Sequence, residues 1–236
     1  MRCLFALCLA GAIALAQAPA TLGEAARMLE DALARDAVAE AQAALAAMPA
    51  LHAGADEGQR KHALQAVAKA ARSDDLGVRH GAFTVLGEMK EKGSSKSLGR
   101  WLNPPKRFKG EIPPSYLEAI RAAGAIADAS TLRKLEDLSD HNDLPVAEAA
   151  TLALGGFHTL PTKARKALAI DLVKRLERLS AQQRRKASEE VYARKAALAA
   201  TTTAALRKLT GKDYQTLDGW KAWAEKAEKE ADPFGP

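Results

Sequence analysis

Cysteine is nearly absent from this sequence. The 236 residues include 2 cysteines, Cys3 and Cys8, and both lie close to the first residue. The rest of the chain therefore has no disulfide bond, no thiolate nucleophile and no cysteine-based metal site. A fold without such cross-links depends on its hydrophobic core, and the roughly 218 residues after residue 18 are enough to form one.

Motifs that mark common enzyme classes are also missing. The sequence has no G-x-S-x-G elbow, no G-x-x-x-x-G-K-[ST] loop and no G-x-G-x-x-G after a strand. Asp137, Asp140 and Asp143 are spaced like part of a calcium loop but lack its central glycine and distal glutamate. None of the histidines has H-E-x-x-H spacing. They are His52, His62, His80, His141 and His158. We therefore predict that the chain has no catalytic residue, binds no cofactor or metal, and is not an enzyme.

Only one long apolar run is present, at Cys3–Ala16, after the positive charge of Arg2. It is shorter than the roughly 20 apolar residues that span a bilayer. Ala16-Gln17-Ala18 fits the small-x-small pattern of a cleavage site. The pattern predicts a cleaved signal peptide at 1–18 and export to the periplasm or the cell exterior. The alternative is a buried N-terminal helix.

The most informative feature of the remaining chain is an internal repeat. The segment 75–87, DLGVRHGAFTVLG, recurs at 143–155 as DLPVAEAATLALG, and 114–124, PSYLEAIRAAG, has a similar shape. In both full copies the apolar residues fall on one face of an α-helix. Asp75 and Asp143 stand where a carboxylate caps a helix N-terminus. A second apolar helix follows each copy, so neighbouring helical pairs must stack to bury both faces.

The pattern D-L-x-V-[RA]-x-x-A-x-x-x-L-G, followed by a second helix, resembles HEAT repeats of the short bacterial kind. The resemblance extends from about Asp56 to Leu209. It implies an all-α fold, an α-solenoid of about four to five stacked antiparallel helical hairpins. The repeats themselves are expected at 73–209.

The two ends of the array are predicted to be caps. Residues 19–72 are alanine-rich and predict a helical pair or capping repeat, with a first helix that Pro49 stops. At the other end, 210–230 contains Trp220 and Trp223, and L-T-G…W-x-x-W resembles the closing segment of exported bacterial HEAT-repeat proteins. We predict a hydrophobic cap there, with a sugar-stacking platform as the alternative, and a disordered tail at 231–236.

Basic residues gather in two places. The proline-rich loop 103–114 contains one cluster, and it either projects as a contact surface or packs Phe108 against a neighbour. From 161 to 195 there are 11 lysines and arginines against 4 acids, a local charge of +7 in a chain of +6. The candidate binding residues are Lys174, Arg178, Arg184, Arg185 and Lys186, with Lys106, Arg107 and Lys109 in the loop.

The alternative for the 161–195 run is a solvated helical face. Asp171 precedes Arg175 by four residues and Glu190 precedes Arg194 by four, so local ion pairs would partly neutralise it. Tyr192 is its single aromatic residue, which weakens the case for single-stranded nucleic acid.

Because solenoids present extended surfaces, we predict a non-catalytic scaffold whose inner helices bind another protein. The first alternative is a polyanion-binding module that uses 161–195 for acidic polysaccharide, envelope lipid or nucleic acid. The second alternative is an accessory domain of an enzyme system. No small-molecule substrate is evident, and a salt-sensitive interaction would favour the polyanion.

Overall fold

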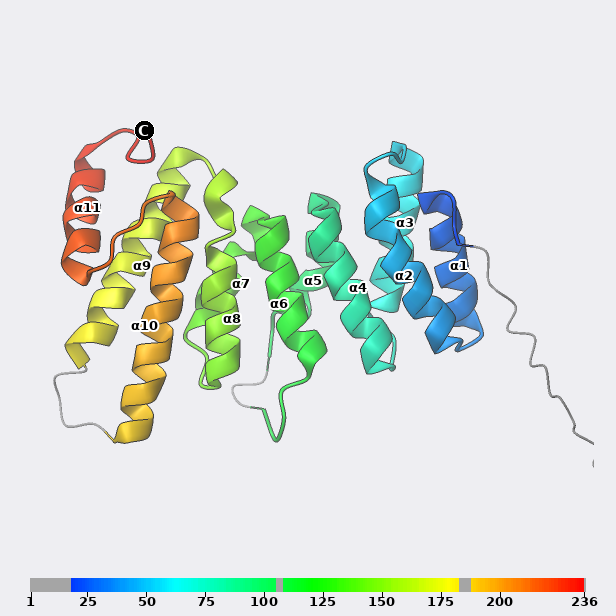
Figure 1. Cartoon of the computed structure of the whole chain (residues 1–236), viewed down its shortest axis with the longest axis horizontal. Coiled ribbons are helices and arrows are strands. Elements are labelled where there is room, and N and C mark those ends of the chain that lie inside the picture. The colour runs from blue at the N-terminus through cyan, green and yellow to red at the C-terminus, as the bar shows by residue number, and fades with distance from the viewer. Residues whose placement is uncertain (1–17, 105–107, 183–187, 236) are drawn as a thin grey trace, which may run out of the picture.

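The computed structural model describes residues 18–104, 108–182 and 188–235 of the chain. Within these ranges every regular element is a helix, and the elements follow one another along the long axis of the molecule (Figure 1). The α-helices are α1 Leu22–Ala34, α2 Val38–His52, α3 Glu57–Ala70, α4 Leu76–Met89, α5 Ser95–Gly99, α6 Pro114–Ile126, α7 Ala129–Ser139, α8 Leu144–Leu154, α9 Thr162–Gln182, α10 Glu189–Thr210 and α11 Leu217–Lys229. Two short 3-10 helices are η1 Lys92–Ser94 and η2 Phe157–Thr159.

The helices form two layers. Each even-numbered helix from α2 to α10 packs on the next even-numbered one, which makes a continuous layer. Each odd-numbered helix from α1 to α9 packs on the helix that follows it in the chain, giving five hairpins, and α11 packs on α9. This is an all-α solenoid, and the predicted fold class is confirmed.

The three related segments of the sequence are α4, α6 and α8, which are neighbours in the even-numbered layer. The glycine that closes each copy lies where the backbone of the next helix approaches. A Cβ on Gly124 would stand 2.5 Å from the Cα of Ala153 in α8. The other two copies are alike, because a Cβ on Gly87 would stand 3.1 Å from the Cα of Ala122 in α6, and a Cβ on Gly155 would stand 3.0 Å from the Cα of Ala205 in α10. The repeat glycine therefore sets the spacing of the layer.

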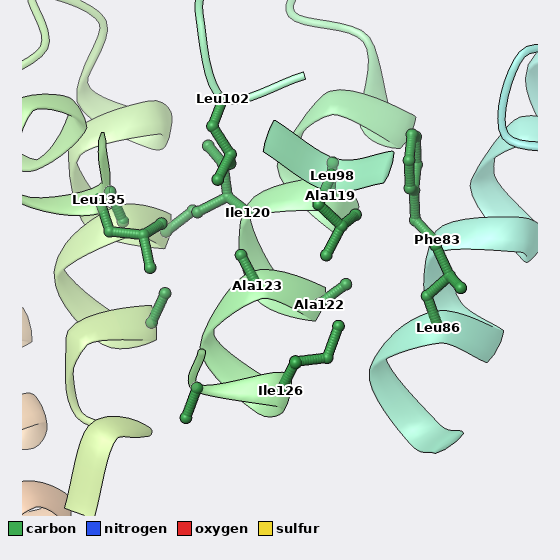
Figure 2. Packing of buried hydrophobic residues seen from close by; sticks show 14 of the residues in the cluster. Phe83, Leu86, Leu98, Leu102, Ala119, Ile120, Ala122, Ala123, Ile126 and Leu135 are labelled. Carbon is green, nitrogen blue, oxygen red and sulfur yellow. The ribbon is translucent and has the colours of Figure 1, made fainter. Parts of the chain in front are cut away.

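The core is continuous from one hairpin to the next, as the region around α6 shows. In Figure 2, Ile120 points toward Leu135 of α7, while Ala122 points toward α4 and Leu86. Ile120, Leu86 and Leu135 are all fully buried. One helix thus contributes apolar surface to both of its neighbours, which is why the repeats depend on stacking.

The two aspartates that the repeat predicts as helix caps differ in the structure. The Asp75 carboxylate accepts a hydrogen bond from the Val78 N–H at 2.8 Å and caps α4. Asp143 also precedes its helix, but its carboxylate makes no capping hydrogen bond to α8. It accepts instead from the Phe108 N–H at 2.9 Å. The capping prediction for Asp143 is therefore corrected, because the loop 103–114 supplies a competing donor.

Residues 19–72 contain three helices rather than the expected pair. The predicted first helix is divided between α1 and α2 by a turn in which Asp36 adopts the left-handed region at φ 53°. Apolar residues, many of them alanine, continue on both sides of the turn. The helical spacing of these residues therefore gives no sign that the helix is interrupted. Pro49 does not stop the helix but lies inside α2, close to its end at His52.

At the other end, α11 covers α9. The Trp220 side chain is 1% exposed and its ring lies 5.1 Å from that of Tyr214. A tryptophan buried to this degree has no face available for a sugar, which excludes the sugar-stacking alternative. The Thr216 hydroxyl caps this helix by accepting a hydrogen bond from the Gly219 N–H.

The tail after α11 packs back on the protein, so the predicted disorder of 231–236 is corrected for the described residues up to 235. The Phe234 ring lies 6.1 Å from the Trp223 ring, and the Arg165 guanidinium lies 3.8 Å from the Phe234 ring centroid. The Lys212 ammonium donates to the Gly235 carbonyl oxygen at 2.9 Å. An aromatic residue near the end supplies apolar contact area that a polar tail would lack.

Residues 1–18 carry the predicted signal peptide, of which 1–17 lie outside the described residues. None of the helices in the described ranges combines the length and the apolar composition that a membrane crossing requires.

Candidate functional site

Large apolar side chains that remain exposed lie in the even-numbered layer. Among the described residues they are Val38 in α2, Leu76 in α4, Leu152 in α8, and Val191 and Tyr192 in α10. Leu152 and Val38 each line a hollow, and the hollow at Leu152 is a groove. The groove has a volume of about 440 Å³ and runs between α6, α8 and α10. It is larger than the hollow at Val38, which has a volume of about 360 Å³.

The groove has an apolar floor and charged sides. Leu117 and Ala125 of α6 line it together with Ala149 and Leu152 of α8. The charged residues at its sides are Arg121 of α6, Glu148 of α8 and Lys208 of α10. Arg121 is bound to Glu118 at 3.0 Å, and both side chains remain partly exposed. An apolar floor with a polar rim is the usual composition of a protein-binding surface.

The register of the repeat explains why Leu152 is exposed. It stands three residues before the repeat glycine, where the other copies have Thr84 and Arg121. This position faces away from the core in α8, and the Leu152 side chain is 49% exposed. Leu152 was not predicted from the sequence as a candidate site residue. The available signal was a leucine that falls off the buried stripe, at a position that is polar in the other copies.

The structure separates the predicted basic residues into three groups. Arg184, Arg185, Lys186, Lys106 and Arg107 lie outside the described residues. Lys109 is exposed in the loop, and Lys174 and Arg178 are exposed on α9. Other members of the 161–195 run are engaged within the fold. Arg165 donates to the Leu209 carbonyl oxygen at 2.8 Å, and Lys166 donates to that of Glu230 at 2.8 Å.

Arg175 and Arg194 hold the end of α7. Arg175 donates to the hydroxyl and the carbonyl oxygen of Ser139 and forms an ion pair with Asp140 at 2.9 Å. Arg194 donates to the carbonyl oxygens of His141 and Asn142, each at 2.7 Å. The last carbonyls of a helix have no partner within the helix, so donors from α9 and α10 satisfy them.

These contacts correct the expected local ion pairs. The sequence spacing predicted Asp171 for Arg175 and Glu190 for Arg194, but the hydrogen bonds and ion pairs of both arginines go to the α7–α8 connection. Burial lowers the pKa of Arg175, which is 8% exposed, although Asp140 raises it. The guanidinium stays charged at neutral pH because an arginine pKa begins far above it.

We expect Arg175→Gln to lower the free energy of unfolding by about 2 kcal/mol, because the Ser139 carbonyl loses its donor and Asp140 loses its cation. Urea denaturation monitored by circular dichroism measures the change. The matched control is Lys174→Gln, one residue earlier and exposed, which should leave stability nearly unchanged. Equal effects of the two substitutions would contradict a structural role for Arg175.

The loop 103–114 packs its aromatic residue inward. The Phe108 ring lies 5.1 Å from that of Tyr116 and 6.2 Å from that of His141. Tyr116 is buried, and this burial raises the pKa of its hydroxyl. Of the two predictions for this loop, the packed insertion therefore describes Phe108, and Lys109 remains exposed beside it.

Several histidines connect separate parts of the chain. His62 of α3 contacts Glu30 of α1 at 3.1 Å, and His52 of α2 contacts Glu91 after α4 at 3.0 Å. These are single pairs. In the part of the chain that the structure describes, no group of three or more histidine, cysteine, aspartate or glutamate side chains is arranged to hold a metal ion.

The fold and its groove define the class as a helical-repeat protein. No protein-family model and no curated protein matches the chain. Among solved structures it is similar to the complex of CpcE and CpcF of phycocyanin lyase from Nostoc sp. PCC7120. The sequence identity is 17%, the TM-score is 0.46, and the match covers 87% of this chain and 82% of that chain.

This comparison corrects one prediction. The absence of recognised motifs led us to predict that the chain is not an enzyme. The matched structure is named as a lyase, and the prediction is withdrawn. A helical-repeat fold without a recognised motif is not sufficient ground for excluding catalysis.

Proposed function

We propose that this chain is an exported helical-repeat protein of the HEAT-like kind that binds a partner protein in the groove between α6, α8 and α10. The repeat pattern and the five hairpins support the HEAT-like assignment. The apolar run at Cys3–Ala16 with its small-x-small site supports export, and with it a location in the periplasm or outside the cell.

The observation that carries the proposal is the exposure of Leu152 within a hollow. A leucine 49% exposed at the centre of an apolar floor loses water contact when a partner covers it. Buried apolar anchors of this kind dominate the energy of protein interfaces. Leu152 replaces the polar residue found at this position in the other copies, which gives the groove an apolar side chain on α8.

The groove suits a helix with an apolar ridge and acidic residues beside it. Neighbouring even-numbered helices leave a channel between them, and an amphipathic helix fills such a channel with side chains spaced three and four apart. Arg121 and Lys208 stand on the two sides, while Glu148 lies in the lining and Glu118 pairs with Arg121. Because both cationic side chains are exposed, they can still pair with acidic residues on the flanks of the partner helix.

Site-specific photo-crosslinking tests this proposal in the exporting cell. A benzoyl-phenylalanine at position 152 should give one main cross-linked protein, and the same group at the exposed Leu76 should not. A helix of the captured protein should then bind the chain from Pro19 onward in a purified system. Binding that persists at high salt supports an apolar interface, whereas binding lost at high salt contradicts it.

We expect Leu152→Asp to weaken that binding by about thirtyfold or more, since an apolar anchor is replaced by a charge facing an acidic partner. Isothermal titration with the captured helix measures the loss. The matched control is Leu76→Asp, which makes the same substitution at an exposed position outside the groove. Equal affinity of the two variants would show that the partner binds elsewhere.

A further inference from the structure

A second hollow lies where three arginines meet. It has a volume of about 300 Å³ and lies between α9, α10 and the end of α7. Its lining consists of Ser139, Asp140, Arg175, Arg178, Leu179, Arg194 and Leu198. Three positive charges therefore face one carboxylate. The Asp140 side chain is 76% exposed and already bound to Arg175, so water and this contact weaken its field in the hollow.

Two of the arginines are held rigidly. The terminal nitrogens of Arg175 donate to the hydroxyl and the carbonyl oxygen of Ser139 at the end of α7. Those of Arg194 donate to the carbonyl oxygens of His141 and Asn142 just after it. Their positive charges are consequently fixed at the wall of the hollow. Carbonyl oxygens satisfy these donors without cancelling the charge, so the hollow remains electropositive.

Arg178 is the third arginine and has no hydrogen bond or ion pair within the described ranges. It lies on α9, one turn after Arg175, and its side chain is exposed. The Nε–H of Arg175 is buried and also lacks an acceptor there. One free guanidinium beside two fixed ones gives a site with unused donors and uncompensated charge.

The titration of Arg175 agrees with this arrangement. Desolvation is the main cause and lowers its pKa, Asp140 opposes this by raising it, and the positive charges of Arg178 and Arg194 lower it further. The three cations therefore repel one another. An anion bound between them would reduce this repulsion, and a guanidinium offers two parallel N–H groups that match an oxyanion.

We propose that this hollow binds the phosphate or sulfate group of a small molecule, and that the Arg178 guanidinium donates hydrogen bonds to it. Leu179 and Leu198 supply an apolar wall for the organic part of the ligand. The hollow lies between two helices and a helix end, and this concave shape suits one compact group rather than a flat membrane. This site is separate from the groove at Leu152, so neither proposal depends on the other.

Inorganic phosphate and inorganic sulfate are the probes, added at constant ionic strength to the chain labelled with ¹⁵N-arginine. We expect a saturable shift of the Arg178 side-chain resonance. Arg178→Gln should weaken binding by about tenfold or more, since a hydrogen-bonded charge pair is lost. Lys163→Gln is the matched control: it removes one exposed positive charge from the same helix outside the hollow, and should change binding less than about twofold.

Equal weakening by both substitutions would show diffuse attraction to a basic helix and would overturn the proposal. So would the absence of any Arg178 shift at saturating phosphate. Binding to phosphatidylglycerol–phosphatidylcholine vesicles but not to free phosphate would assign the arginines to a membrane surface instead. An unchanged melting temperature of Arg178→Gln, expected for an exposed side chain, shows that any loss of binding is not a loss of fold.

Discussion

Replacing Gly124 by alanine is expected to lower the free energy of unfolding by about 2–3 kcal/mol, although alanine is the better helix former. The new Cβ would lie 2.5 Å from the Cα of Ala153 and 2.8 Å from its carbonyl oxygen. Both atoms belong to the backbone of α8, so no side-chain rotation removes the clash. Helices α6 and α8 would have to move apart.

Two opposing effects decide the size of this change. Alanine gains roughly 1 kcal/mol over glycine inside a helix. Overpacking usually costs about 1–3 kcal/mol, and more when backbone must shift. Separating α6 from α8 also loosens a layer whose hairpins are stabilised mainly by their neighbours. The loss therefore exceeds the gain, and chemical denaturation followed by circular dichroism measures the difference.

Gly54→Ala is the matched control for Gly124→Ala. Its Cβ would meet nothing within 4 Å, so the same substitution should be neutral or slightly stabilising. If Gly124→Ala were as stable as Gly54→Ala, the close approach of α6 to α8 would not be a property of the protein in solution.

Replacing Trp220 by alanine is expected to destabilise the C-terminal end by about 3 kcal/mol. The side chain is fully buried and packs on Tyr214 and on Trp223, whose ring lies 6.1 Å away. Its Nε1–H is buried without an acceptor in the described residues, and removing this unsatisfied donor offsets a little of the loss. The expected loss of stability is therefore at the lower end of the range for replacing a buried tryptophan by alanine.

The effect of Trp220→Ala should be local, because α11 packs on α9 at the end of the array. Hydrogen exchange should accelerate in α9 and α11, while α1 to α4 keep their protection. Lys221→Ala is the control on the same helix. Its exposed ion pair with Glu177 at 3.1 Å contributes little, so protection should not change. Uniform acceleration along the whole chain would contradict a repeat-by-repeat architecture.

The repeat helices were predictable from sequence because their signals are local. The stripe of apolar residues in 75–87 follows from helical geometry alone, and Asp75 caps α4 as expected. The turn at Asp36 was not predicted, because it has no such local signal. It interrupts a run of alanines without glycine or proline, so nothing in the local composition distinguishes it.

The candidate sites were only partly predictable. Arg178 was identified from the charge of its segment, and Leu152 was passed over although its position in the repeat differs in polarity from the other copies. The charge of the 161–195 run was visible in the sequence, but its distribution between the fold and the solvent was not.

The sequence by itself determined that this protein is a stack of helical pairs, since the period of its apolar residues and its repeated glycines require close neighbours. Only the tertiary structure decided what the arginines do. Arg175 meets Ser139 and Asp140 because the end of α7 leaves carbonyl oxygens unpaired beside α9. Contacts between residues this far apart in sequence depend on how helices stack, which no local pattern encodes.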